Sequence, residues 1–153
     1  MVFSSKYKMI FLNLIGGLSI FFVLVVLRFP VLVNSDMLLN ADEAIMAYQI
    51  LDLYNGNSYF TYYDVTKYFG ITNGLAAFPF FWALGIGALA FKLPATLFYA
   101  LYILSAYWLV KKIQPQAALT VILLMIFTSP SIWSLTTLNY GVGLVCFLGN
   151  LIF

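Results

Sequence analysis

Residues 9–27 read MIFLNLIGGLSIFFVLVVL, nineteen residues without a charged side chain. A run of about 20 apolar residues is long enough to cross the hydrocarbon core of a bilayer as a helix. The pair Gly16-Gly17 predicts a point of close approach for a neighbouring helix. Arg28 follows and closes the run, so we expect a first transmembrane helix over residues 9–28.

The composition of the whole chain agrees with this start. Of 153 residues, 64% are apolar and 8% are charged, and the mean hydropathy is +1.01. A soluble domain is nearer half apolar and a quarter charged, so composition predicts an integral membrane protein. The absence of histidine excludes histidine bases and imidazole ligands, and the single Cys146 excludes an intrachain disulfide and a thiolate zinc site. A net charge of +2 does not favour nucleic acid as a partner.

Further apolar runs follow from residue 75 onward. Residues 93–110 and 117–135 predict two more spanning helices. The last run, 141–153, has thirteen residues and is too short to span. We therefore expect a chain that ends inside a transmembrane helix. It would be the N-terminal part of a longer protein whose C-terminal part is missing, or a reading frame cut short.

Residues 75–91 are a weaker spanning candidate, because they number only seventeen and contain a proline and two glycines. If they crossed, Lys111 and Lys112 would lie outside, against the bias of cytoplasmic loops toward lysine and arginine. We expect a membrane-lying or re-entrant helix instead. The N-terminus is then cytoplasmic and loop 29–73 extracytoplasmic, in the plasma membrane if the source is bacterial.

All five acidic residues lie within this loop, between positions 36 and 64. A plain connector is usually about 4–6 residues long, so loop 29–73 is expected to carry structure. Asn40 is a helix-capping residue, Glu43 three positions later completes a capping-box pattern, and residues 44–54 favour helix up to Asn55-Gly56. The predicted fold class is all-α: polytopic transmembrane helices with a long external loop carrying juxtamembrane helices.

The short helix in the loop is expected to lie against membrane or protein, because its apolar side chains gather on one side. That side comprises Ala44, Ala47, Tyr48, Leu51 and Tyr54.

Two interpretations compete for the adjacent acids Asp42 and Glu43. Acids in the first turn of a helix complement its dipole, an effect of about 0.3–1 kcal/mol, and spacing alone favours this structural interpretation. The functional interpretation is a carboxylate pair at the membrane surface, acting as a general base or as oxygen ligands for a divalent cation such as Mg²⁺ or Mn²⁺.

The order of these features resembles the N-terminal region of the GT-C superfamily. These polytopic glycosyltransferases use polyprenyl-phosphate-linked sugars and include protein O-mannosyltransferases, aminoarabinose transferases and lipopolysaccharide-core sugar transferases. The matching motifs are Asn-Ala-Asp-Glu-Ala at 40–44 and Gly-Ala-Leu-Ala-Phe-Lys-Leu-Pro at 87–94, where Lys92 replaces the family's arginine. The resemblance covers roughly residues 9 to 145, and its order along the chain is more specific than either motif.

The resemblance implies transfer of a sugar from a polyprenyl-phosphate donor to a hydroxyl acceptor on the extracytoplasmic face. It makes Asp42 the catalytic carboxylate, and Glu43 the neighbour that orients it or holds a metal. The candidate substrate-binding residues are Lys67, Lys92 and Tyr63, and the candidate metal ligands are Asp42, Glu43 and Asn139. Asn139 stands where many members carry a further acid, so it would offer a carbonyl oxygen without charge.

Two other interpretations remain open at the level of sequence. In the first, the chain is a small non-catalytic membrane subunit, or a component that binds or transports cations through its acidic loop. In the second, it is an inactive truncated remnant. Transport predicts charged side chains within the spans, and residues 9–27, 93–110 and 117–135 contain none. The fragment alone is not expected to turn over substrate, because most spans of a family member are absent.

Overall fold

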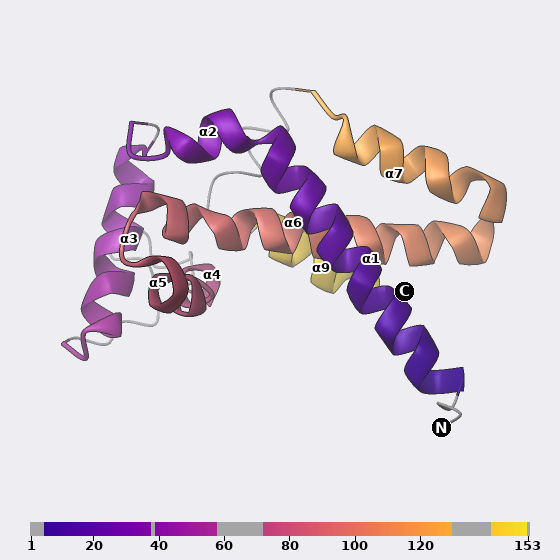
Figure 1. Ribbon diagram of the computed structural model, residues 1–153, viewed down its shortest axis with the longest axis horizontal. Helices are drawn as coiled ribbons and strands as arrows, with labels where there is room; N and C mark the ends of the chain where they lie inside the picture. Colours follow the sequence, from indigo (N-terminus) through magenta and orange to yellow (C-terminus); the bar gives the residue numbers. More distant parts are fainter. Residues whose placement is uncertain (1–4, 38, 58–71, 130–141, 153) are drawn as a thin grey trace.

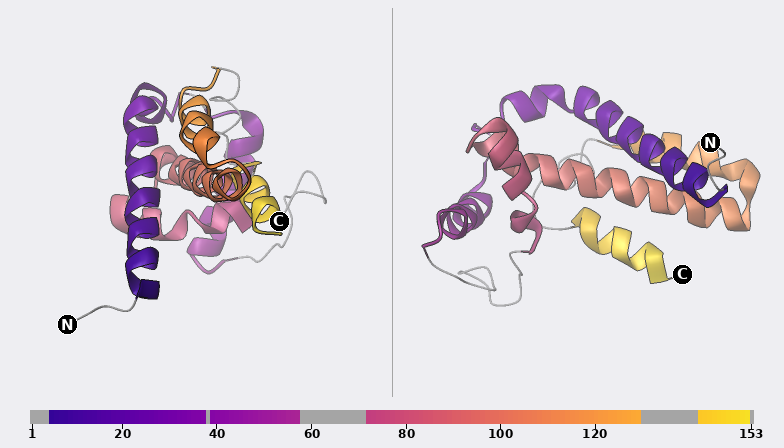
Figure 2. Two further views of the ribbon diagram at one scale, coloured as in Figure 1. Left: turned by 90° about the vertical axis from the view of Figure 1, so that its right-hand side faces the viewer. Right: turned by 60° about the horizontal axis from the view of Figure 1, so that its bottom comes forward.

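The computed structural model describes residues 5–37, 39–57, 72–129 and 142–152, and the regular structure within these ranges is entirely helical. The longest helix, α6 (Ala88–Ile113), runs through the middle of the molecule (Figure 1). The other helices pack around α6 or at its N-terminal end, as Figures 1 and 2 show from three directions. The all-α prediction is confirmed.

Helix α1 (Ser5–Leu27) crosses α6 and packs on it through the predicted glycine pair. A Cβ atom added to Gly17 would lie 3.3 Å from Leu104 Cδ2, so the small residue does allow a close approach. Further along the crossing, a buried cluster joins α1 to α6 and to α7 (Ala118–Ile126). Its buried members are Leu24, Tyr99, Ala100, Ile103 and Ile126.

The segment predicted as one helix over 75–91 is instead divided among three helices. Helix α4 (Thr72–Leu75) and helix α5 (Phe78–Leu84) are separate, and α5 ends at Gly85, whose φ of 83° favours glycine. Helix α6 then begins at Ala88, five residues before the predicted start at 93. Pro94 lies inside α6. Lys92 is consequently a helical residue in the second turn of α6.

The C-terminal end of α6 turns back through the 3₁₀ helix η1 (Pro115–Ala117) into α7. The Tyr99 hydroxyl donates a hydrogen bond of 2.7 Å to the Met125 carbonyl and so ties the two helices together. The first part of the predicted span over 117–135 forms α7, which ends at Ile126, and residues 130–135 lie outside the described residues. Nine residues extend about 13 Å at 1.5 Å per residue, less than a bilayer core of about 30 Å.

Helix α9 (Val142–Ile152) packs along α6, on another side from α7 (Figure 2). Asn150 Nδ2 donates a hydrogen bond of 3.0 Å to Ser105 Oγ across this interface. At the other end, a Cβ atom on Gly143 would lie 2.9 Å from the Tyr99 amide nitrogen. At this position the α6–α9 interface therefore has room for no residue larger than glycine.

Two glycines of α9 should respond in opposite directions to alanine. Gly143→Ala should destabilise the chain by about 1–3 kcal/mol, because the methyl group overlaps backbone that cannot rotate away. Gly149→Ala is the matched control, since nothing lies within 4 Å of its added Cβ. It should stabilise the helix by about 0.5–1 kcal/mol. Thermal unfolding in detergent measures both, and equal shifts for the two variants would contradict the described interface.

The predicted external loop does carry helices. These are α2 (Phe29–Val33) and α3 (Ala41–Tyr54), and α3 lies beside the N-terminal end of α6 (Figure 1). The α3 helix begins directly after the predicted cap Asn40 and ends at Tyr54, as predicted. A cluster of buried apolar side chains joins α3 to α5 and α6: Met46, Ile50, Ala77, Phe81, Ala90 and Phe91.

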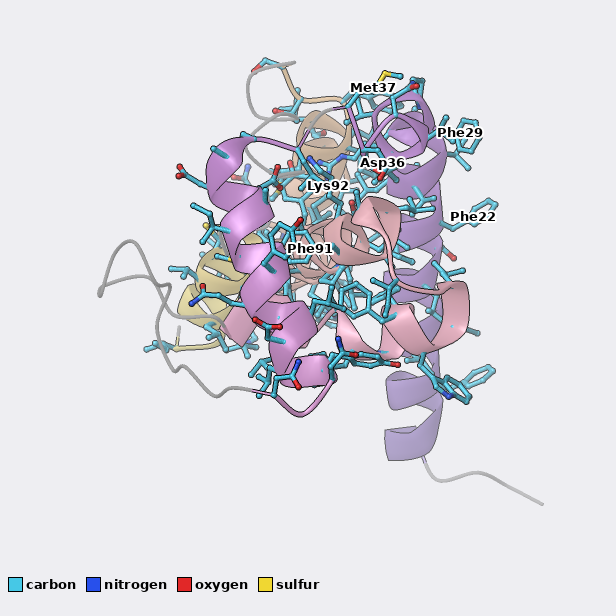
Figure 3. All side chains as sticks on the ribbon, turned by 90° about the vertical axis from the view of Figure 1, so that its left-hand side faces the viewer. Phe22, Phe29, Asp36, Met37, Phe91 and Lys92 are labelled. Atoms are coloured by element: carbon cyan, nitrogen blue, oxygen red, sulfur yellow. The ribbon has the colours of Figure 1, made fainter. Side chains whose placement is uncertain are left out.

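The membrane prediction receives support from α6. Among the described residues, this one helix is both long and apolar enough to cross a membrane, while the stretches 14–27, 115–126 and 143–152 are shorter apolar helices. Large apolar side chains are also exposed on the outer side of α1 and α2. Figure 3 shows Phe22 and Phe29 projecting away from the helices. These features favour association with a membrane.

Candidate functional site

The candidate site begins with the cap of α3. Asn40 has an extended backbone, and its side-chain oxygen accepts a hydrogen bond of 2.8 Å from the Glu43 amide. This bond satisfies one of the amide groups that the first turn of a helix leaves open. It also fixes where the helix starts, and so places Asp42 and Glu43 in the first turn, as the sequence predicted.

Loss of this cap should have a measurable cost. Asn40→Ala removes the acceptor for the Glu43 amide and should destabilise the chain by about 1 kcal/mol. Asn57→Ala is the control, because Asn57 is an exposed residue beyond the other end of α3, and should change the free energy of unfolding by less than about 0.5 kcal/mol. Equal effects in chemical unfolding would show that the capping bond contributes nothing.

Asp42 and Glu43 have opposite environments although they are neighbours. The Asp42 side chain is exposed, whereas Glu43 is fully buried. Lys92 Nζ forms an ion pair of 2.9 Å with Glu43 Oε2, and the two side chains are only 2% and 1% exposed. In Figure 3, Lys92 and Phe91 lie beside α3. The site therefore combines one accessible carboxylate with a buried ion pair that links α3 to α6.

The structure brings together three of the predicted site residues: Asp42, Glu43 and Lys92. The ammonium group of Lys92, expected to contact substrate, lies instead on the carboxylate of Glu43. The other three predicted site residues, Tyr63, Lys67 and Asn139, lie outside the described residues.

The buried face of α3 differs from the apolar side that the sequence predicted. Glu43, Met46 and Ile50 point inward, at positions i, i+3 and i+7 of the helix. The prediction was wrong because it grouped the apolar side chains of α3 alone, whereas the burial of Glu43 depends on Lys92, which is distant in sequence. Gly74 of α4 packs so closely on Ile50 that a Cβ atom there would overlap its side chain.

Most of the predicted apolar side of α3 faces a pocket with a volume of about 370 Å³. The pocket lies between α3, the end of α5 and the first turn of α6. Small residues make room for it, and aromatic rings form its walls. Its lining residues are Leu39, Ala44, Ala47, Tyr48, Leu51, Phe81, Ile86, Gly87, Ala88 and Phe91. Such a surface suits an apolar ligand or a lipid chain.

A second buried cation was not predicted from sequence. Arg28 is fully buried at the junction of α1 and α2, and its guanidinium lies 4.7 Å from the centre of the Tyr99 ring. An arginine directly after an apolar span was interpreted as a boundary residue. The missed signal was the spacing of Lys92, Thr96 and Tyr99, which places polar groups on one face of α6 at i, i+4 and i+7.

The charged groups of the site include one exposed carboxylate and one that is held in a buried ion pair. An exposed carboxylate such as that of Asp42 is a group that can accept a proton from a hydroxyl. Within the described ranges, no group of three or more acidic, cysteine or histidine side chains is placed to hold a metal ion. No protein-family model, curated protein or solved structure matches the chain.

Proposed function

We propose that the chain is part of a polytopic membrane glycosyltransferase of the GT-C type, with Asp42 as its general base. The enzyme transfers a sugar from a polyprenyl phosphate to a hydroxyl acceptor on the extracytoplasmic face. The observation that carries this proposal is the exposed carboxylate of Asp42, next to a Glu43 that a buried ion pair fixes at the start of α3.

The chemistry asked of Asp42 is a single proton transfer. As the acceptor oxygen attacks the anomeric carbon, the carboxylate removes the hydroxyl proton, and the bond from that carbon to the phosphate oxygen breaks. Attack from the side opposite the leaving group inverts the anomeric configuration. A carboxylate within hydrogen-bond reach of a weak nucleophile provides this kind of help.

Two further features support the proposal. The apolar pocket beside α3 offers a surface for the lipid part of a donor, and it lies next to the helix that carries Asp42. The N-terminus of α1 and the C-terminal end of α6, which carries Lys111 and Lys112, lie toward the same end of the molecule, and α3 lies toward the other (Figure 1). Lysines favour the cytoplasmic side, so this arrangement suits an extracytoplasmic α3.

The test uses the native protein, purified from its own membranes through a tag at its N-terminus. The probes are undecaprenyl-phosphate glucose, mannose, galactose and arabinose, each labelled in the sugar, together with a membrane extract as acceptor. We expect release of undecaprenyl phosphate from one of them. A photoreactive undecaprenyl phosphate should also crosslink to the protein. If undecaprenyl phosphate is neither released nor crosslinked, and the protein conducts cations in liposomes, the transport alternative replaces the enzyme.

A further inference from the structure

We propose that Lys92 is a positioning residue for Asp42, acting through its ion pair with Glu43. The inference rests on the proposed function, because that function makes the Asp42 carboxylate the reacting group. It also reassigns Lys92, which sequence reasoning made a substrate contact. The pair holds α3 in one rotation and one register on α6, and so determines the direction in which Asp42 points.

Helix geometry connects the two acids. Successive residues of an α-helix project about 100° apart, because 3.6 residues complete one turn. The Glu43 side chain points inward, and its carboxylate is held 2.9 Å from Lys92 Nζ. The direction of the preceding side chain, that of Asp42, is therefore fixed as well. Asp42 is exposed for this reason, since the residue beside it is anchored.

The apolar contacts of α3 do not provide this control by themselves. Met46 and Ile50 pack against the buried apolar cluster, but burial of apolar surface is non-directional and tolerates sliding and rotation. An ion pair between two buried side chains has a narrow range of distances and angles. It therefore specifies which rotation of α3 is occupied, in a way that apolar packing does not.

The anchor of the pair belongs to the most extensively packed helix of the molecule. Lys92 is flanked in α6 by Phe91 and Leu93, both buried, and α6 packs against α1, α2, α5, α7 and α9. At the other end of α3, the Tyr54 ring makes edge contacts with Phe78 and Phe81, with ring centres 5.3 and 5.6 Å apart. The helix is thus held by an ionic contact at its start and by aromatic contacts at its end.

Energetics also favour a role in specificity. Replacing a buried ion pair with apolar side chains of similar size is often neutral or stabilising, so stability alone does not explain why a charged pair occupies this position. A pair joining residues 49 apart in sequence ties the start of α3 to one position on α6. That docking is what places Asp42.

The first test measures the docking of α3 without any enzymatic activity. In a Cys146→Ser background, Met46→Cys is a buried reporter, and its rate of reaction with a maleimide reports release of α3. Tyr48→Cys, at an exposed position on the same helix, gives the unprotected rate. Lys92→Met should raise the rate at position 46 at least tenfold. The control is Lys112→Met, which replaces an exposed lysine of α6, the helix that carries Lys92, and should leave the rate at position 46 unchanged.

A second reporter distinguishes release of α3 from general unfolding. Ile103→Cys lies in the buried α1–α6 cluster and should stay protected in the Lys92→Met protein. The exchanged pair Glu43→Lys with Lys92→Glu should restore protection at position 46. An unchanged rate at position 46 in Lys92→Met would overturn the proposal, and so would equal loss of protection at positions 46 and 103.

The kinetic test separates positioning from substrate binding. In the native protein, Lys92→Met should lower kcat at least tenfold and leave the KM for the polyprenyl-phosphate sugar within twofold. Lys92→Arg should recover most of the activity. A tenfold rise in KM with unchanged kcat would make Lys92 a phosphate contact and overturn the proposal. If Asp42→Asn is fully active and Lys92→Met still releases α3, the proposed function fails, but the ion pair is still shown to position α3.

Discussion

Asp42→Asn should reduce sugar transfer by about 100-fold or more, because general-base catalysis typically contributes 10²–10⁴-fold to rate. Asparagine has nearly the same shape as aspartate but cannot accept the proton of the acceptor hydroxyl. The donor should still bind, so the loss is expected in kcat. Release of undecaprenyl phosphate by the purified native protein measures it.

The matched control for this variant is Asp52→Asn. Asp52 is also an exposed carboxylate of α3, ten residues further along the helix, and the change removes the same charge from the same surface. It should leave the rate within about twofold. Equal losses in both variants would attribute the effect to the surface charge of α3, and full activity of Asp42→Asn would remove Asp42 from the mechanism.

Glu43→Leu should destabilise the folded chain by about 3–5 kcal/mol, the usual effect of removing one partner of a buried ion pair. The Lys92 ammonium would lose the carboxylate that lies 2.9 Å away, while the lysine side chain stays buried. Chemical unfolding of the protein in detergent measures the change in the free energy of unfolding. An exposed acid of the same helix provides the control: Asp52→Leu should change it by less than about 0.5 kcal/mol.

The double variant Glu43→Leu with Lys92→Met completes the experiment. Because both buried charges are then gone, most of the lost stability should return. This recovery separates the cost of an uncompensated charge from the packing of the glutamate side chain itself. A double variant as unstable as the sum of the two single variants would mean that the side chains do not interact.

Local features of the fold were predictable from sequence. The start of α3 follows from Asn40 and its end from Asn55-Gly56, because capping and chain reversal depend on residues a few positions apart. The glycine pair of α1 was also identified correctly, since small residues in an apolar helix indicate a close approach. These signals are short in range, and the structure confirms them.

Features that depend on distant partners were not predictable. The inward direction of Glu43 follows from Lys92, 49 residues away, and no periodic pattern within α3 reveals it. The start of α6 was placed too late because the two apolar runs were divided at Lys92, whereas Lys92 lies inside α6 and is paired with Glu43. The exposure of Asp42 next to a buried neighbour was therefore available only from the structure.

The long separation of Glu43 and Lys92 also sets an order of assembly during synthesis. Glu43 and Lys92 are 49 positions apart, so at about 5–20 residues per second the ribosome needs roughly 2–10 s to reach the lysine after adding the glutamate. Throughout that interval α3 exists without the lysine that holds it, so its helix can form but its final docking cannot. The site around Asp42 is therefore completed only after α6 has been made, although α1 and α3 both precede α6 in the chain.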